Sequence, residues 1–220
     1  MILSANFGEK IRIKKLEQAY NAQVVVDTEG SYLIVGERVT NKPNDKQELV
    51  PDVNTIPQNI RKVSTVIADS GFYSENAIMK LESEKNATCF ISVEKMKHNK
   101  SVEDLEKHSD PPPLPENAPT KEKMKQRLKT KQGKEIYKQR KQTVEPVIGI
   151  IKQVMGFRQF LLRGIEKVNI EWTLVTLAYN FKRLFNILSK TTNLNSIVKD
   201  ISQYLSIPDN STVFFTLQAA

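Results

Sequence analysis

The stretch VSTVIADSGFYS, residues 63–74, decides the fold of this chain of 220 residues. It begins with a short, almost continuous apolar run that ends just before Asp69, as expected of a central β-strand. The sequence DSG then turns the chain, and Ser74 is a candidate N-cap for a helix that runs to about Lys85. The apolar run at residues 88–92 is typical of the next strand. This order predicts an α/β fold with a carboxylate fixed at a strand end.

The segments on either side complete this architecture. Two β-rich runs, residues 19–26 and 32–39, are separated by DTEG and predict a hairpin. Asn44 or Asp45 is a candidate cap for a short helix that prolines interrupt. Residues 168–188 form the most apolar helical pattern, and its two apolar faces predict burial against the sheet. We therefore expect a mixed sheet flanked by helices.

Positive charge is concentrated in one segment. The chain has a net charge of +8, and residues 121–141 hold ten basic and two acidic residues, an excess equal to that of the whole chain. A concentrated excess favours a surface that follows nucleic-acid phosphates. The alternative is a solvated basic helix or linker. The pattern predicts a helix from Lys121 to Lys131, a break at Gly133, and a second helix from Lys134.

Composition excludes several other classes of protein. A single cysteine rules out a disulfide framework within the chain and a multi-cysteine zinc site, and Cys89 is expected in the core. The sequence shows neither a signal-peptide pattern nor an apolar stretch long enough to span a membrane. We expect a cytoplasmic protein without membrane contact. Trp172 is expected in the core, with base stacking as the alternative.

The segment EPVIGIIK, residues 145–152, supplies a second acid. Glu145 and Lys152 are seven residues apart, about two helical turns, and would face the same way. Pro146 predicts that Glu145 lies at a fresh helix start or at a kink. An acid at a strand end and another on a basic helix can assemble a two-metal phosphoryl-transfer site, which usually needs a third carboxylate. Lys152 could equally be a solvated helix lysine.

Several segments taken in order resemble the catalytic domain of bacterial insertion-sequence DDE transposases. The resemblance covers roughly residues 18–188 and implies an RNase H-like fold. It also implies that two aspartates and a glutamate bind two Mg²⁺ ions, and that the protein cuts and joins DNA at the terminal inverted repeats of an element. The segments are YNAQVVVD (20–27), IADSGFYS (67–74), RKQTVEPVIGIIK (140–152), GFRQF (156–160) and LAYN (177–180).

The resemblance assigns the acidic site residues. Asp69 corresponds to the second acid of the family and Glu145 to the third, so both are candidate catalytic residues and metal ligands. The family's first aspartate precedes the YNAQ strand, whereas no aspartate precedes Asp27 in this chain. Asp27 could substitute for it, or could belong to the hairpin turn. We expect an N-terminally truncated, inactive remnant with an exposed sheet edge.

The family signature Tyr-x2-Arg-x3-Glu-x6-Lys gives candidate DNA-binding residues. Four residues, rather than three, separate Arg140 from Glu145, and Lys141 restores that spacing only by breaking the spacing to Tyr137. The candidates for contact with DNA phosphates are Tyr137, Arg140, Lys141 and Lys152.

The domain organisation follows from these segments. We expect an N-terminal remnant, a first part of the RNase H-like domain, a polar and basic insertion or linker, C-terminal helices of the catalytic domain, and a tail. Their ranges are 1–18, 19–92, 93–133, 134–189 and 190–220.

Three functions remain open from the sequence. The first is a truncated transposase. The second is a non-catalytic DNA-binding or regulatory protein that inhibits full-length transposase, and the third is another RNase H-like nuclease, which the run after Glu145 disfavours. The expected partners are DNA, a second copy of the chain, or full-length transposase.

Overall fold

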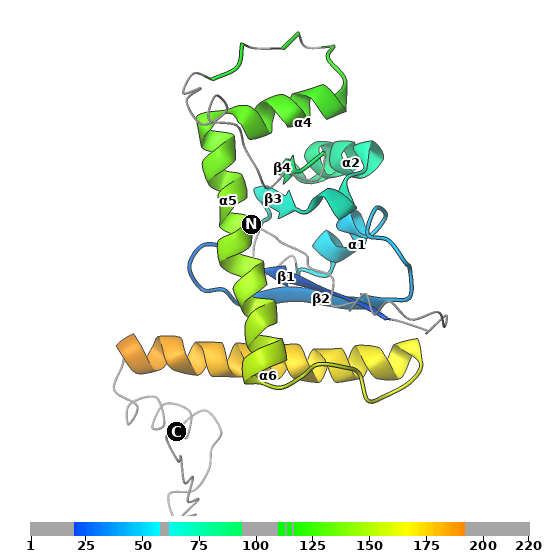
Figure 1. The fold of residues 1–220 in the computed structure, drawn as a ribbon, viewed down its shortest axis with the longest axis vertical. Helices are drawn as coiled ribbons and strands as arrows, with labels where there is room; N and C mark the ends of the chain where they lie inside the picture. The colour runs from blue at the N-terminus through cyan, green and yellow to red at the C-terminus, as the bar shows by residue number, and fades with distance from the viewer. Residues whose placement is uncertain (1–19, 58–61, 94–109, 113, 116, 192–220) are drawn as a thin grey trace, which may run out of the picture.

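The computed structural model describes residues 20–57, 62–93 and 110–191, apart from residues 113 and 116. The sequence segments 1–18, 94–109 and 192–220 lie outside the described residues. The fold is α/β, as predicted (Figure 1). Its elements are β1 (Asn21–Val26), β2 (Ile34–Thr40), α1 (Leu49–Asn54), β3 (Thr65–Ala68), the 3-10 turn η1 (Ser70–Phe72), α2 (Glu75–Lys85), β4 (Thr88–Ile91), α4 (Thr120–Lys129), α5 (Lys131–Gly149), the π-helical turn η2 (Ile150–Val154) and α6 (Ile165–Thr191).

The strands pair in both directions. β1 and β2 form the predicted antiparallel hairpin, and β3 and β4 pair in parallel through the crossover helix α2. The prediction of parallel and antiparallel pairing is therefore confirmed. The described strands form two separate two-stranded sheets rather than one continuous mixed sheet.

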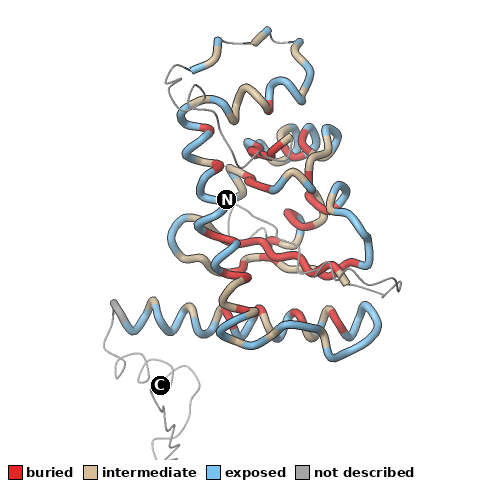
Figure 2. Tube along the Cα trace, viewed as in Figure 1, coloured by how far each residue is buried: buried red, intermediate tan, exposed pale blue. Residues whose placement is uncertain are grey.

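The strands nevertheless lie in one layer between two layers of helices. Because successive residues of a strand point to opposite faces, each strand contributes to two apolar clusters. α5 covers the face formed by Val24, Val26, Ile67 and Phe90, and buried side chains of α6 join this cluster from the edge of β2. α1, α2 and α4 cover the face formed by Val25, Val66, Ala68, Cys89 and Ile91. Figure 2 shows this burial concentrated along the strands and on the inner sides of the helices.

Helix α6 closes the free edge of β2 with side-chain amides. Asn180 accepts a hydrogen bond from the Ile34 N–H and donates one to the Ile34 carbonyl, each at 2.8 Å. Asn169 accepts from the Val39 N–H at 2.9 Å. These bonds replace those of a neighbouring strand, which an edge strand otherwise leaves unmade. Two asparagines about three helical turns apart therefore fix α6 along β2.

Trp172 anchors the same helix in the core. Its side chain is fully buried, and its indole N–H donates to the Gln23 carbonyl at 3.0 Å. Phe157 and Phe160 from the preceding loop pack on the ring, with centroids 6.0 Å away. The core role predicted for Trp172 is confirmed, and the base-stacking alternative is excluded because the ring is covered.

The prediction that both apolar faces of α6 are buried is wrong. Only one face packs on β2, and large apolar side chains on the opposite face are exposed. Within the described part of the chain, no helix combines the length and apolar content that a membrane crossing requires.

Three local predictions about helix ends also need correction. α5 continues through Pro146, which excludes a fresh helix start at Glu145 and leaves the alternative of a kink. The break between α4 and α5 falls at Thr130, whose hydroxyl accepts from the Gly133 N–H at 2.9 Å. Gly133 lies inside α5, where an added Cβ would come within 1.8 Å of the Arg127 carbonyl oxygen. Glu48 rather than Asn44 or Asp45 precedes α1 as its N-cap residue.

Replacing Asn180 should test the edge closure of β2. Asn180→Leu removes both hydrogen bonds and leaves the buried Ile34 N–H and carbonyl without their partners, which costs about 1–3 kcal/mol of unfolding free energy. Urea unfolding of the purified chain measures this loss. Asn186→Leu, at an exposed position of the same helix, is the matched control and should change stability by less than about 0.5 kcal/mol. Equal effects of the two substitutions would contradict the edge closure.

Candidate active site

Asp69 lies at the carboxyl end of β3, as predicted. It is the N-cap of η1, and its Oδ1 accepts a hydrogen bond from the Ser70 N–H at 2.8 Å. The side chain is exposed, whereas the strand before it is buried. The strand therefore fixes the backbone of Asp69, and the turn orients its carboxylate toward solvent.

Ser92 is a site residue that the sequence analysis missed. The parallel register pairs Ala68 with Ile91, so the residues that follow, Asp69 and Ser92, leave the sheet at the same edge. Carboxyl ends of parallel strands are where α/β proteins gather functional side chains. The position of Ser92 directly after the predicted strand was the available signal.

Tyr137 of α5 reaches this edge of the sheet. Its phenol is buried and forms hydrogen bonds with Ser92 and Arg140. Burial raises the pKa of Tyr137 above its ordinary value, the nearby Arg140 cation lowers it, and the Asp69 carboxylate raises it again. The charge of Asp69 is thus felt at the Tyr137 hydroxyl, so α5 and the end of β3 form one polar cluster.

Arg140 connects this cluster to Glu145. Its guanidinium lies 6.0 Å from the centroid of the Tyr137 ring and 3.2 Å, nitrogen to oxygen, from the Glu145 carboxylate. Arg140 is largely buried, whereas the Glu145 side chain is 54% exposed. Arg140 therefore links Glu145 to Tyr137, and the charge of Asp69 acts on the same phenol.

The acidic residues do not complete a two-metal site. Tyr137 and Glu145 are eight residues apart on α5, roughly 12 Å along the helix axis. No group of three His, Cys, Asp or Glu residues in the described ranges could hold a metal ion together. One or two carboxylates can hold a Mg²⁺ ion that keeps several waters, but a two-ion centre needs more ligands. The described acids do not fit the pair of Mg²⁺ ions that the resemblance implies.

Asp45 supports the turn that carries Asp69. Asn21 and Gln23 project from the same face of β1, and their side-chain amides donate to Asp45 Oδ1 at 2.6 and 2.8 Å. Asp45 Oδ2 faces Gly71, where an added Cβ would lie only 3.2 Å away. The polar residues of the YNAQ segment thus hold a carboxylate against the turn after Asp69. Sequence reasoning placed Asp45 only as a helix cap.

Exposed lysines share a face of α5 with Glu145. Lys134, Lys138 and Lys141 precede Glu145 by 11, seven and four residues, spacings that place all four side chains on one side of a helix. The three lysines are exposed. The basic segment therefore presents an aligned row of cations that leads to Glu145.

The two remaining predicted residues have different settings. Lys152 lies in η2, where π-helical geometry replaces the regular turn that the seven-residue spacing from Glu145 assumed. Asp27 belongs to the hairpin turn, because its carboxylate accepts hydrogen bonds from Ser31 Oγ and the Glu29 N–H. Of the two alternatives that the sequence left for Asp27, these contacts support the hairpin turn.

Comparison with known proteins identifies one related family. The family model described as "Transposase DDE domain" matches residues 7–181, which include both predicted acids and the whole of α5. A search of curated proteins and a search of solved structures each found no significant match.

The polar cluster predicts opposite pKa changes at Tyr137. Asp69→Asn removes a negative charge that disfavours the phenolate, so the pKa of Tyr137 should fall. Arg140→Gln removes a positive charge that favours the phenolate, so the pKa should rise. Ultraviolet titration of each variant against its Tyr137→Phe counterpart isolates this phenol.

Glu75→Gln is the matched control for the loss of a carboxylate. Glu75 raises the pKa of Tyr73, which burial and this neighbour bring to about 12. The control should lower the pKa of Tyr73 and leave that of Tyr137 unchanged. An unchanged pKa of Tyr137 in the Asp69→Asn variant would show that Asp69 and Tyr137 are not neighbours.

Proposed function

Because this chain belongs to the family of transposase DDE domains, we propose that it is an insertion-sequence protein that binds DNA at element ends without cutting it alone. The family relation makes DNA the expected substrate, and the α/β fold agrees with an RNase H-like domain. The observation that carries the DNA-binding proposal is the row of exposed lysines on α5. Because DNA is the proposed partner, we expect the protein at the nucleoid in the cytoplasm.

The lysine row suits the DNA backbone. Flexible ammonium groups at positions 134, 138 and 141 can each contact a phosphate, and phosphate contacts supply most sequence-independent affinity. Arg127 is engaged elsewhere, since it binds Glu82 at 2.6 Å and the Cys89 carbonyl at 2.7 Å. We propose that Lys141 and the lysines beside it contact DNA, while Tyr137 and Arg140 position the acidic residues.

We infer the loss of DNA cleavage from the small number of carboxylates at the candidate site. The resemblance assigns Asp69 and Glu145 as family acids, and no third His, Cys, Asp or Glu within the described residues lies where it could hold a metal ion with them. The family generally uses divalent metal ions, and Mg²⁺ binding by this chain stays a prediction.

A second candidate function is regulation of intact transposase. A chain that keeps the DNA-binding surface without a complete acidic site would occupy element ends and block them. Adding the chain to an intact transposase reaction should then reduce end cleavage in proportion to its concentration. A Lys134→Gln, Lys138→Gln, Lys141→Gln variant that inhibits equally would exclude competition for DNA.

Salt dependence tests the DNA-binding surface. Binding of the full chain to a short mixed-sequence duplex should weaken as salt rises, with a log–log slope of about −0.9 per neutralised phosphate. The triple variant Lys134→Gln, Lys138→Gln, Lys141→Gln should bind more weakly and with a slope smaller by up to about 2.7. Fluorescence anisotropy at several salt concentrations measures both.

The control variant loses the same three positive charges from a different part of the surface. Lys46→Gln, Lys62→Gln, Lys80→Gln removes three exposed lysines outside α4 and α5. It should leave the slope nearly unchanged. Equal losses in the two triple variants would show that net charge, rather than the α5 row, attracts DNA.

Cleavage is tested on a supercoiled plasmid that carries the DNA flanking the coding sequence. The chain and its Glu145→Gln variant should nick this plasmid at the same background rate in Mg²⁺. Gel separation of supercoiled and nicked forms measures the rate. Mg²⁺-dependent nicking that Glu145→Gln abolishes would refute the proposed loss of activity.

A further inference from the structure

The loop that joins η2 to α6, residues 155–164, turns apolar side chains both inward and outward, and we call it the tip loop. On its inner side, two phenylalanines pack on the buried ring of Trp172. On its outer side, Leu161 is 79% exposed, more than any other large apolar side chain in the described ranges, and Leu162 is 45% exposed. Figure 2 shows exposure along most of this loop, and Figure 1 places it at the end of α5 away from α4. The fold therefore buries the aromatic side of the tip loop and leaves its leucines to solvent.

The backbone of the tip loop is fixed, so the two leucines are held outward. The Glu171 carboxylate of α6 accepts hydrogen bonds from the Leu161 N–H at 2.9 Å and from the Leu162 N–H at 3.0 Å. The Gly164 N–H donates to the Tyr20 hydroxyl at 2.8 Å. Gly164 has a φ of +92°, which residues with a side chain rarely adopt. Little conformational freedom would therefore be lost when the leucines enter a partner.

The charges around the leucines select the partner. Residues 152–163 contain three basic residues and no acidic one: Lys152, Arg158 and Arg163. The two arginines flank the leucines in sequence, and both are exposed. Glu171, the carboxylate that faces the loop, is engaged by the two leucine N–H groups. A projecting apolar tip between cations suits a nucleic-acid duplex, which carries phosphates outside and stacked bases within.

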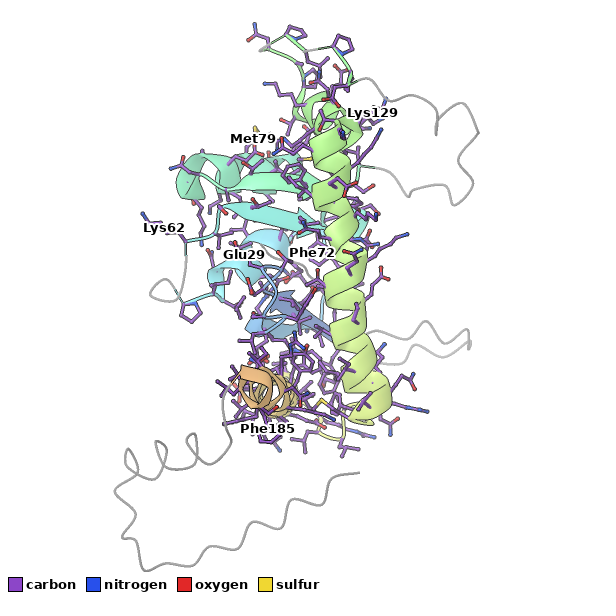
Figure 3. All side chains as sticks on the ribbon, turned by 90° about the vertical axis from the view of Figure 1, so that its left-hand side faces the viewer. Glu29, Lys62, Phe72, Met79, Lys129 and Phe185 are labelled. Atoms are coloured by element: carbon purple, nitrogen blue, oxygen red, sulfur yellow. The ribbon has the colours of Figure 1, made fainter. Side chains whose placement is uncertain are left out.

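The tip loop lies within reach of a duplex that α5 binds. Lys141 and Val154 are 13 residues apart along α5 and η2, roughly 20 Å of helix axis. This length is less than one turn of B-DNA, which is about 34 Å. The tip loop begins directly after Val154, and Figure 3 shows side chains projecting outward around the lower end of α5 and α6. One duplex can therefore meet both the lysine row and the tip loop.

We propose that Leu161 and Leu162 form a wedge that enters the base stack of bound DNA from the minor groove, while the arginines beside them contact the phosphates. Apolar wedges of this kind unstack a base step and kink the duplex. Pyrimidine–purine steps such as TA unstack most easily, so the wedge should favour them. This inference rests on the proposed function, because it requires that the chain binds DNA. It adds that the bound duplex is distorted at a defined point.

Permanganate oxidation tests the wedge, because it detects unstacked thymines anywhere in a duplex. At protein concentrations that saturate binding by anisotropy, the full chain should raise thymine reactivity several-fold at TA steps of a duplex made from the DNA that flanks the coding sequence. Leu161→Ala with Leu162→Ala should lose this increase and keep the salt slope, because the phosphate contacts remain. Leu174→Ala with Leu177→Ala, which removes two exposed leucines of α6 outside the tip loop, is the matched control and should keep the increase.

Glu171→Ala tests the wedge with both leucines in place. Without the carboxylate the two N–H groups lose their acceptor, so thymine reactivity should fall while DNA is still bound. Binding without a rise in reactivity, or a rise that the Leu161→Ala, Leu162→Ala variant keeps, would overturn the wedge and leave the proposed function standing. Absence of binding by the full chain would overturn both. Binding to phosphatidylserine vesicles that the same double variant abolishes, without thymine unstacking, would also overturn the wedge and assign the tip loop to lipid.

Discussion

The parallel pairing of β3 with β4 is the constraint on which the site depends. A parallel pair requires a crossover, which α2 supplies, and it must be covered on both faces. The residues just beyond the two strands then emerge side by side, which is why Asp69 and Ser92 share an edge. α5 crosses this edge, so Tyr137 meets both strand ends while remaining buried. The contacts of Tyr137 with Ser92 and Arg140 follow from that crossing.

The basic segment is uniform in sequence but divided in structure. Arg127 and Arg140 turn inward, where one binds Glu82 and a strand carbonyl and the other joins Tyr137 to Glu145. The exposed lysines of α5 turn outward. A planar guanidinium can make several fixed hydrogen bonds inside a protein, whereas an ammonium on a flexible chain suits solvent and phosphate. Charge counting alone overstates the surface available to a polyanion.

Local patterns predicted the elements that local forces determine. The hairpin, β3, α2 and β4 each carry a complete signal within a few residues, and the position of Asp69 at a strand end came from the same signal. Asp45 had no such signal, because its role depends on amides of Asn21 and Gln23 more than 20 residues away.

Pro146 is accommodated inside α5 because neighbouring Val144 and Val147 are buried and hold the helix in place. Tertiary packing overrode the local rule there. The two faces of α6 were visible in the sequence, but an apolar face does not reveal whether its cover lies within the same chain.

The amide contacts between α6 and β2 can form only late in synthesis of the chain. Asn180 lies 146 residues after the Ile34 backbone that it completes. At ribosomal rates of about 5–20 residues per second, the hairpin emerges roughly 7–30 s before that partner exists. Throughout this interval β2 has an open edge that another strand can occupy. The nascent chain is therefore most exposed to mispairing before its last described helix leaves the ribosome, and a chaperone that shields the hairpin would act during that interval.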